Sequence, residues 1–470
     1  MNFEAIIGLE IHVGMKTKTK MFSSAPVAFG KEPNTLVAPF DAAFPGSMPT
    51  VNKQAVINAI RVCHALKMEI DNELWFDRKN YFYSDLPKGY QITQKKRPIG
   101  KNGTLTFGDK TIRVEKLQIE EDACKQLHYK DYTLLDFNRA GVPLIEIVTV
   151  PDIRNGEEAM RCIEKIRSIV TFLNVSTGKM EEGSLRCDVN VSMRPFGSKE
   201  FGTVVEIKNV NTLANIQRAI DFEISRQEKI LLSGEPVPKE TRRYDERKKQ
   251  TVLMRTKVDD IDYKYFTEPN IAPIKLSKEF IEEAIKSSPA LAEEKKINYL
   301  SMGLNDYDSN LLLMSKETSD YFDEVISNQV NPKLAANWIN VDIQAILNKD
   351  NQTIDNFVIK PNQLAELIKL IEDGTIKNKQ AREIFSEMVK TKKLAHEILK
   401  ENQVVLLSNE SQILEIINQV LDNNSRLVVD YQNGKDKVIG YIVGQVMKKT
   451  SGKANPELVN KLVINTLKER

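Results

Sequence analysis

The segment KMEEGSLRCDVN, residues 179–190, decides how the rest of the chain is interpreted. It gathers several charges and then becomes a regular alternation of polar and apolar side chains. The polar face carries Arg186, Asp188, Asn190 and Ser192, and the apolar face carries Cys187, Val189 and Val191. A period of two residues is typical of a strand that is buried on one side. The segment therefore predicts a half-buried strand whose other face is chemically active.

Four other segments repeat this design. In IIGLEIHV (residues 6–13), Glu10 and His12 share the polar face of an apparent strand, about 7 Å apart. The remaining three are PLIEIVTV (143–150) with Glu146, VVEIKNV (204–210) with Glu206 and Lys208, and EKLQIEEDACK (115–125), which ends in Glu120, Glu121 and Asp122. Each of the five segments offers at least one carboxylate.

If these polar faces converge, several carboxylates meet one imidazole and two or three cations. Like charges roughly 4–6 Å apart repel by about 3–4 kcal/mol per pair at an effective dielectric constant near 20, so the cluster would favour a divalent metal. Oxygen ligands with one histidine suit magnesium or manganese, and magnesium with open positions commonly serves a nucleotide phosphate. The alternative is that these are ordinary solvated sheet faces.

Composition and motifs argue against several classes of protein. The 470 residues carry a formal net charge of only +2, so any contact with RNA must be local, and we expect neither DNA nor a membrane as a partner. Four scattered cysteines fit neither a zinc ribbon nor a disulfide framework, which suits the cytoplasm. We expect no leader peptide, and the sequence has no apolar run of 18 residues, no phosphate-binding glycine loop and no catalytic triad pattern.

The pattern of the chain changes along its length. Strand and helix patterns are mixed up to about residue 290, helices separated by polar turns follow, and the last seventy residues read as short helices. We expect an α+β fold with a mixed-sheet domain at 1–290, a helical domain at 291–400 and a small helical tail at 401–470. From residue 431 the tail has eight basic and three acidic residues, which indicates either an RNA-backbone footprint or surface solubility.

One further segment, DRKNYFYSDLPKGYQIT (residues 77–93), interleaves basic and aromatic side chains. Such residues can stack and pair with nucleic acid, or they can form the wall of a polar passage, and a purely structural loop is a third interpretation. A later charged segment ends in the aromatic residues Tyr263, Tyr265 and Phe266, and it is predicted to be a solvated face.

Seven motifs, taken together and in order, carry a family resemblance. They are GLEIHVGMKTKTKMF, DRKNYFYSDLPKGYQIT, EEDACK, NRAGVPLIEIV, KMEEGSLRCDVNVS, EIKNVNT and ETRRYDERKKQTVLMR. The chain resembles the B subunits of bacterial aspartyl/glutamyl-tRNA amidotransferases, and the resemblance extends through the VGQVMKKTSGKANPELVN tail.

The resemblance implies a cradle-shaped kinase domain, a helical domain and a tail that touches tRNA. The activity would be ATP- and magnesium-dependent (or manganese-dependent) phosphorylation of the side-chain carboxylate of Glu-tRNA(Gln) or Asp-tRNA(Asn). Ammonia from a glutaminase A subunit would then form the amide, and a small C subunit would hold A and B together. Phosphoryl transfer needs positioning and charge neutralisation rather than a covalent nucleophile, which agrees with the residues.

The resemblance also assigns residues by motif. The metal shell would be Glu10, His12, Glu121, Glu146, Asp188 and Glu206, and the gate of the ammonia path would be Lys79, Tyr81 and Lys88. In the basic tail, Lys448, Lys449 and Lys453 are our own candidates for tRNA contacts. Arg186 and Lys208 are our own candidates for catalytic phosphate contacts. Val150 stands where the family pattern has an acidic residue. The rival interpretations are a non-catalytic RNA-binding scaffold and a metal-dependent phosphodiesterase.

Overall fold

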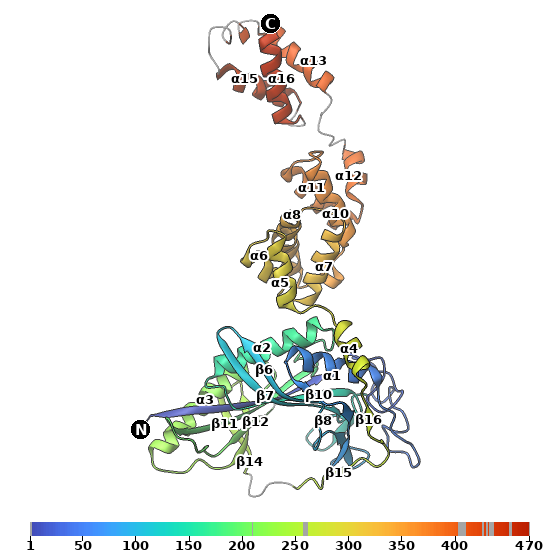
Figure 1. Ribbon diagram of the computed structural model, residues 1–470. Helices are drawn as coiled ribbons and strands as arrows, with labels where there is room; N and C mark the ends of the chain where they lie inside the picture. Colours follow the sequence, from blue (N-terminus) through green and yellow to red (C-terminus); the bar gives the residue numbers. More distant parts are fainter. Residues whose placement is uncertain are drawn as a thin grey trace. The chain divides into compact units, whose positions relative to one another are not determined.

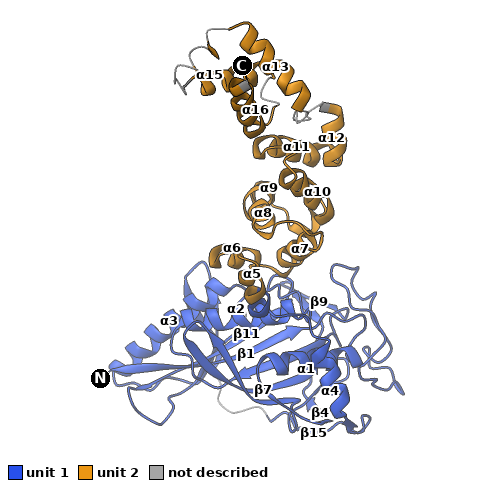
Figure 2. Ribbon diagram, turned by 45° about the horizontal axis from the view of Figure 1, so that its top comes forward, with its two compact units in different colours: residues 1–295 blue, residues 296–470 orange. Residues whose placement is uncertain are grey.

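The computed structural model describes residues 2–469, except 209, 257–261, 403–409, 425–426, 429–430, 432–436 and 451–453. The chain forms two compact units, Met1–Lys295 and Lys296–Arg470 (Figure 2). The first unit combines a large sheet with helices, and the second is helical, so the fold is α+β. None of the described helices has both the length and the apolar content that a membrane span needs.

A nine-stranded sheet organises the first unit (Figure 1). In spatial order its strands are β14 (Gln250–Thr256), β13 (Glu240–Asp245), β12 (Val205–Lys208), β11 (Leu185–Pro195), β1 (Phe3–Gly14), β10 (Pro143–Thr149), β7 (Lys110–Glu121), β6 (Gly100–Phe107) and β2 (Glu69–Ile70). Neighbouring strands are antiparallel except β12 and β13, which are parallel. Helix α3 (Leu213–Leu232) provides the crossover that this parallel pair requires.

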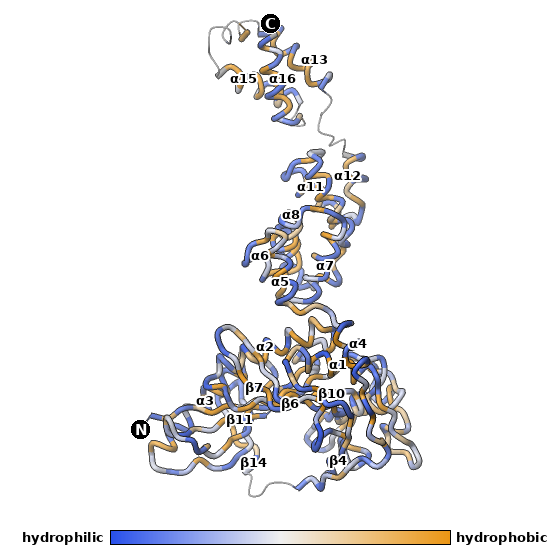
Figure 3. The backbone as a smooth tube through the Cα atoms, in the orientation of Figure 1, coloured by the Kyte–Doolittle hydropathy of each residue, from blue (hydrophilic) through white to orange (hydrophobic). Residues whose placement is uncertain are grey.

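The apolar face of the sheet forms the main core. Helices α1 (Lys53–Ala65), α2 (Gly156–Phe172) and α3 contact β7, β1 and β11 respectively. Leu9 and Ile11 of β1 are fully buried, and so is the apolar stripe of α2 that includes Cys162 and Ile166. Figure 3 shows hydrophobic residues gathered along the central strands and the adjacent helices. Polar and apolar residues therefore alternate along these strands because one face of each strand packs into this core.

Three small sheets complete the first unit, together with α4 (Lys278–Lys286). They are β15 (Phe266–Thr267) with β4 (Asp77–Asn80) and β5 (Tyr90–Thr93), β16 (Ile274–Lys275) with β3 (Glu73–Leu74), and β8 (Lys125–His128) with β9 (Thr133–Asp136). The three-stranded sheet is tied to β7, because Gln118 Nε2 donates to Thr93 Oγ1 at 3.2 Å and Gln91 Nε2 donates to the Glu121 carbonyl at 2.6 Å. This sheet therefore brings the basic and aromatic segment of residues 77–93 against the large sheet.

The second unit consists of helices around two hydrophobic clusters. One cluster lies between Tyr299 and Leu399 and the other between Ile413 and Leu467. The elements are α5 (Ala292–Ser301), α6 (Asp306–Leu312), α7 (Lys316–Ser327), α8 (Pro332–Asn337), the π-helix η1 (Trp338–Ile343), α9 (Gln344–Asp350), the 3-10 turn η2 (Ile354–Asn356), α10 (Pro361–Glu372), α11 (Asn378–Thr391), α12 (Ala395–Asn402), α13 (Glu410–Asp422), α15 (Lys437–Lys449) and α16 (Pro456–Glu469). Each cluster is a separate core within the unit.

Candidate functional site

The strand register gathers the predicted polar side chains in the middle of the large sheet. Strand β1 lies between β10 and β11, and its His12 is the partner of Glu146 on one side and of Arg186 on the other. Glu10, two residues earlier, is the partner of Asp188. Since alternate residues share a face, these side chains all project from the face opposite the helices. The polar faces of β1, β10 and β11 therefore converge, which the sequence alone could not establish.

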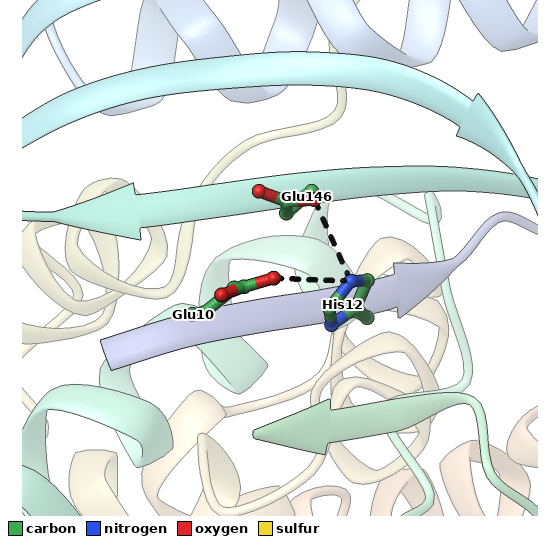
Figure 4. A group of neighbouring side chains, drawn as sticks. All are labelled: Glu10, His12 and Glu146. Carbon is green, nitrogen blue, oxygen red and sulfur yellow. Dashed lines mark ion pairs between the residues drawn. The ribbon is translucent and has the colours of Figure 1, made fainter. Parts of the chain in front are cut away.

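His12 is the centre of this group (Figure 4). Its Nε2 atom lies 3.8 Å from Glu10 Oε1, 3.6 Å from Glu146 Oε2 and 3.4 Å from Glu120 Oε1. One ligand atom from each of Glu10, His12 and Glu146 lies within 4.8 Å of the others. Two carboxylates and one imidazole at this spacing are a donor set that suits magnesium or manganese.

Each ionisable residue of the group shifts the pKa of its neighbours. Burial opposes a charge on His12, but the adjacent carboxylates of Glu120 and Glu146 outweigh burial and raise the pKa of His12 to about 10. Burial and the neighbouring Glu146 raise the pKa of Glu10. For Glu146, burial is outweighed by the contact with His12, and the pKa is lowered. A protonated His12 therefore offsets part of the negative charge of the adjacent carboxylates, and Lys116, 4.0 Å from Glu146 Oε1, adds to this effect.

Glu120, rather than the predicted Glu121, faces His12. The Glu121 carboxylate lies 2.5 and 2.6 Å from Lys88 Nζ and accepts a hydrogen bond from the Ile92 amide at 3.0 Å. The structure thus corrects the expectation that Glu121 joins the group of Glu10 and His12. The signal was present in the sequence, because buried Leu117 and Ile119 place residue 121 on the core face and residue 120 on the polar face.

Asp188 and Glu206, also predicted as metal ligands, hold a lysine in the structure. Lys208 Nζ donates to Asp188 Oδ2 at 2.7 Å and lies 3.1 Å from Glu206 Oε1. Glu206 also accepts a hydrogen bond from Thr241 Oγ1 at 3.0 Å. Burial lowers the pKa of Lys208, but the two carboxylates outweigh it, so the pKa is raised. These two acids therefore lie beside the group of three potential ligands and are not part of it.

Arg186, the second candidate for phosphate contact, is held in a similar way. Its Nη2 atom donates to Asp122 Oδ2 at 2.8 Å. Its Nε atom is buried and has no hydrogen-bond partner among the described residues. The guanidinium of Arg186 is therefore oriented by Asp122 through one nitrogen, while a second nitrogen lacks a partner among the described residues.

The three predicted gate residues occupy two places. Lys79 and Tyr81 line the same cleft as Glu10 and His12, whereas Lys88 is buried in its pair with Glu121, 4.4 Å from the centre of the Phe40 ring. The cleft has a volume of about 310 Å³. Its lining consists of Glu10, His12, Lys79, Tyr81, Gln91, Glu120, Asp122, Ala123, Leu144, Leu185, Arg186, Cys187, Asp188, Lys208, Val210 and Asn211.

Two other predictions concern the tail and Val150. Lys448 and Lys449 are exposed in the last turn of α15, and Lys453 lies outside the described residues. Val150 directly follows β10, four residues and therefore about 13 Å along the strand from Glu146. The valine at this position thus removes no ligand from the group around His12.

Comparisons with known proteins cover nearly the whole chain. Residues 5–282 match the family described as GatB/GatE catalytic domain, and residues 320–467 match the one described as GatB domain. The chain is 46% identical over 475 residues to the B subunit of the aspartyl/glutamyl-tRNA(Asn/Gln) amidotransferase of Lysinibacillus sphaericus, with 100% of both chains covered. It is 47% identical over 481 residues to the protein of the same name in Mesoplasma florum, with 99% of this chain and 100% of the relative covered.

Proposed function

The chain belongs to the family of aspartyl/glutamyl-tRNA(Asn/Gln) amidotransferase B subunits, and from this premise we propose that its polar sheet face activates a carboxylate with ATP. The substrate is the side-chain carboxylate of Glu-tRNA(Gln) or Asp-tRNA(Asn). One carboxylate oxygen attacks the γ-phosphorus of ATP, and ADP leaves. Uncharged ammonia then attacks the acyl phosphate carbon, inorganic phosphate leaves, and a proton is lost to give the amide.

The observation that carries this proposal is the convergence of Glu10, His12 and Glu146 at a cleft that Glu10 and His12 line together with Lys79, Arg186 and Lys208. These three residues would hold magnesium or manganese. When bound, the metal ion supplies positive charge that offsets the charge of the phosphates. Carboxylates alone would repel ATP, so the neighbouring cations also serve to make the cleft acceptable to an anion.

Arg186 and Lys208 are the proposed phosphate contacts. Both lie on the sheet face next to Glu10 and His12, and each is oriented by acidic partners: Asp122 holds Arg186, and Asp188 and Glu206 hold Lys208. A cation that is already oriented loses little side-chain entropy when a phosphate oxygen becomes its new partner. These acids thus orient Arg186 and Lys208 so that both can contact phosphate oxygens in the transition state.

The pair of Lys88 and Glu121 is the proposed gate for ammonia. Lys88 lines a separate surface hollow with Phe82 and Tyr83, while Gln91 lines the cleft that contains His12. Lys88 binds the Glu121 carboxylate and Gln91 donates to the Glu121 carbonyl, so Glu121 links a residue of the hollow to a residue of the cleft. Ammonia from the glutaminase A subunit, which the small C subunit holds against this chain, would enter when the pair separates.

The remaining parts of the proposal concern architecture and tRNA. The first unit acts as the cradle-shaped kinase domain, and the exposed Lys448 and Lys449 of α15, together with Lys453, contact the tRNA backbone. Phosphate contacts of this kind are independent of sequence and weaken with salt.

The test uses the complete amidotransferase with acylated tRNA, labelled ATP and glutamine over a magnesium series. His12→Ala should abolish ATP cleavage that depends on mischarged tRNA, while glutamine hydrolysis by the A subunit persists. The control is His64→Ala, because His64 is exposed on α1 on the other side of the sheet. Normal amide formation by the His12→Ala complex at ordinary magnesium would overturn the proposal. A scaffold would give no ATP cleavage at all, and a phosphodiesterase would hydrolyse its substrate without glutamine or mischarged tRNA.

A further inference from the structure

Tyr263 and Tyr265, which follow the charged segment, lie beside strand β4, which carries Lys79. β15 pairs with β4, with Phe266 opposite Arg78. The Asn80 amide donates to the Tyr263 carbonyl at 2.9 Å, and Asn80 Nδ2 donates to the Lys264 carbonyl at 2.6 Å. The backbone of residues 263–267 is therefore fixed to β4, which places its side chains beside the cleft.

The rings of Tyr263 and Tyr81 both lie near the Lys79 ammonium. Lys79 Nζ lies 4.7 Å from the centre of the Tyr263 ring and 5.8 Å from that of Tyr81. Tyr263 meets Tyr81 edge to face at 5.9 Å and meets Tyr265 at 6.1 Å. Each ring thus supports the next, and two of them attract the same ammonium group.

Tyr265 continues this wall toward the carboxylate group. Burial raises the pKa of its hydroxyl, and the nearby carboxylates of Glu146 and Glu120 add to the effect. The Lys95 ammonium lies 5.7 Å from the centre of the Tyr265 ring. The wall formed by Tyr81, Tyr263 and Tyr265 therefore extends from the Lys79 ammonium to the Lys95 ammonium.

The aromatic residues could either stack on a nucleobase or hold a cation, and the geometry favours the second role. Lysine ammonium groups already lie on the rings of Tyr263 and Tyr265, and the rings contact one another edge to face, so stacking on a nucleobase would require their separation. Phe82 and Tyr83, by contrast, are 94% and 59% exposed. The three-tyrosine wall is therefore suited to holding a cation in place.

We propose that Tyr263, supported by the ring of Tyr265, is a positioning residue for Lys79, which it holds as a fixed cation at the side of the cleft. The inference rests on the proposed function, in which ammonia enters the cleft that Lys79 lines. A fixed ammonium repels NH₄⁺ and leaves neutral NH₃ free to pass, and only NH₃ has the lone pair that attacks the acyl phosphate. Without this cation, the acids around His12 would attract NH₄⁺.

The experiment compares Tyr263→Leu with Tyr263→Phe in the complete complex, because leucine removes the aromatic face and phenylalanine keeps it. The readout is the amount of amide formed per glutamine hydrolysed. Tyr263→Leu should lower this ratio by about 2- to 30-fold, the range that corresponds to a cation–π contact, and Tyr263→Phe should restore most of it. Phe266→Leu is the matched control, since the Phe266 ring contacts Arg78 instead.

A second variant makes the result specific to Lys79. In a Lys79→Met background, Tyr263→Leu should have no further effect on the ratio, because the cation that the ring holds is gone. Equal ratios for the leucine and phenylalanine variants, or an undiminished effect of Tyr263→Leu in the Lys79→Met background, would overturn the inference. Failure of the proposed function is distinguishable, because the unaltered complex would then show no ATP cleavage with mischarged tRNA.

Discussion

Replacing Glu120 by glutamine should lower the pKa of His12 and so reduce proton competition for metal binding near neutral pH, whereas the same change at Glu121 should do neither. Glu120 Oε1 lies 3.4 Å from His12 Nε2, and the Glu120 side chain is buried. Two unit charges at this distance attract by about 5 kcal/mol at an effective dielectric constant near 20. Loss of that energy would lower the pKa of His12 by at most about 3.6.

The expected change is smaller than this limit, because Glu146 still faces His12 and the glutamine amide retains part of the polar contact. Opposite charges at such distances typically move a pKa by about 1 to 3. Since the pKa of His12 starts at about 10, we expect a value between about 7 and 9 in the Glu120→Gln variant. The histidine therefore begins to lose its proton near neutral pH.

The assay is an NMR titration of histidine-labelled protein in the presence of a chelator. The chain has four histidines, and a His12→Gln variant assigns the resonance. Glu121→Gln is the control, because it breaks the buried pair with Lys88 and should cost about 3–5 kcal/mol of unfolding free energy without changing the His12 titration. Manganese binding by both variants gives a second readout. An equal fall in the pKa of His12 in both variants would refute the reasoning.

Three further predictions follow from charge and burial. Metal ligation requires loss of the His12 proton, so manganese affinity should rise about tenfold per pH unit between about pH 6 and 9, and calorimetry in two buffers should detect proton release. Burial raises the pKa of Cys63, and that of Cys162 to about 12, so thiol reagents at pH 8 should label these groups only upon unfolding; rapid labelling of the native chain would contradict this. Replacing Lys448 and Lys449 by alanine should reduce the salt slope of tRNA binding by about 1.4 to 1.8 in a sodium chloride series, and an unchanged slope would assign both lysines to solubility.

Strands were predictable wherever apolar and polar residues alternate without interruption. In β1 and β11 the phase of the alternation is unambiguous, so the face that carries Glu10, His12 and Arg186 could be assigned from the sequence. β7 has a register shift opposite Val148 and Thr149, and it ends in consecutive acids. Consecutive acids do not alternate with apolar residues, so their own pattern does not show which face each one occupies. Glu120 and Glu121 could be assigned to opposite faces only by counting from Leu117 and Ile119.

Contacts between strands were not predictable from the spacing within each strand. Glu206 and Lys208 share a face at a two-residue spacing, but only the register of β11 against β12 brings Asp188 to the same lysine. Tyr263 and Tyr265 lie far from Lys79 in the sequence, and the pairing of β15 with β4 is too short to leave a pattern. Pairings of this kind depend on the whole fold and are absent from any local window of sequence.

The alternation along β1 also has a genetic consequence. A mutation at Ile11 removes a core contact and lowers the amount of folded chain, so a second, intact gene copy would mask it. A mutation at Glu10 or His12, one residue away, removes chemistry and leaves the apolar face intact. The inactive chain would still compete for the partner subunits, and such alleles should therefore behave as dominant negatives when the two copies are co-expressed.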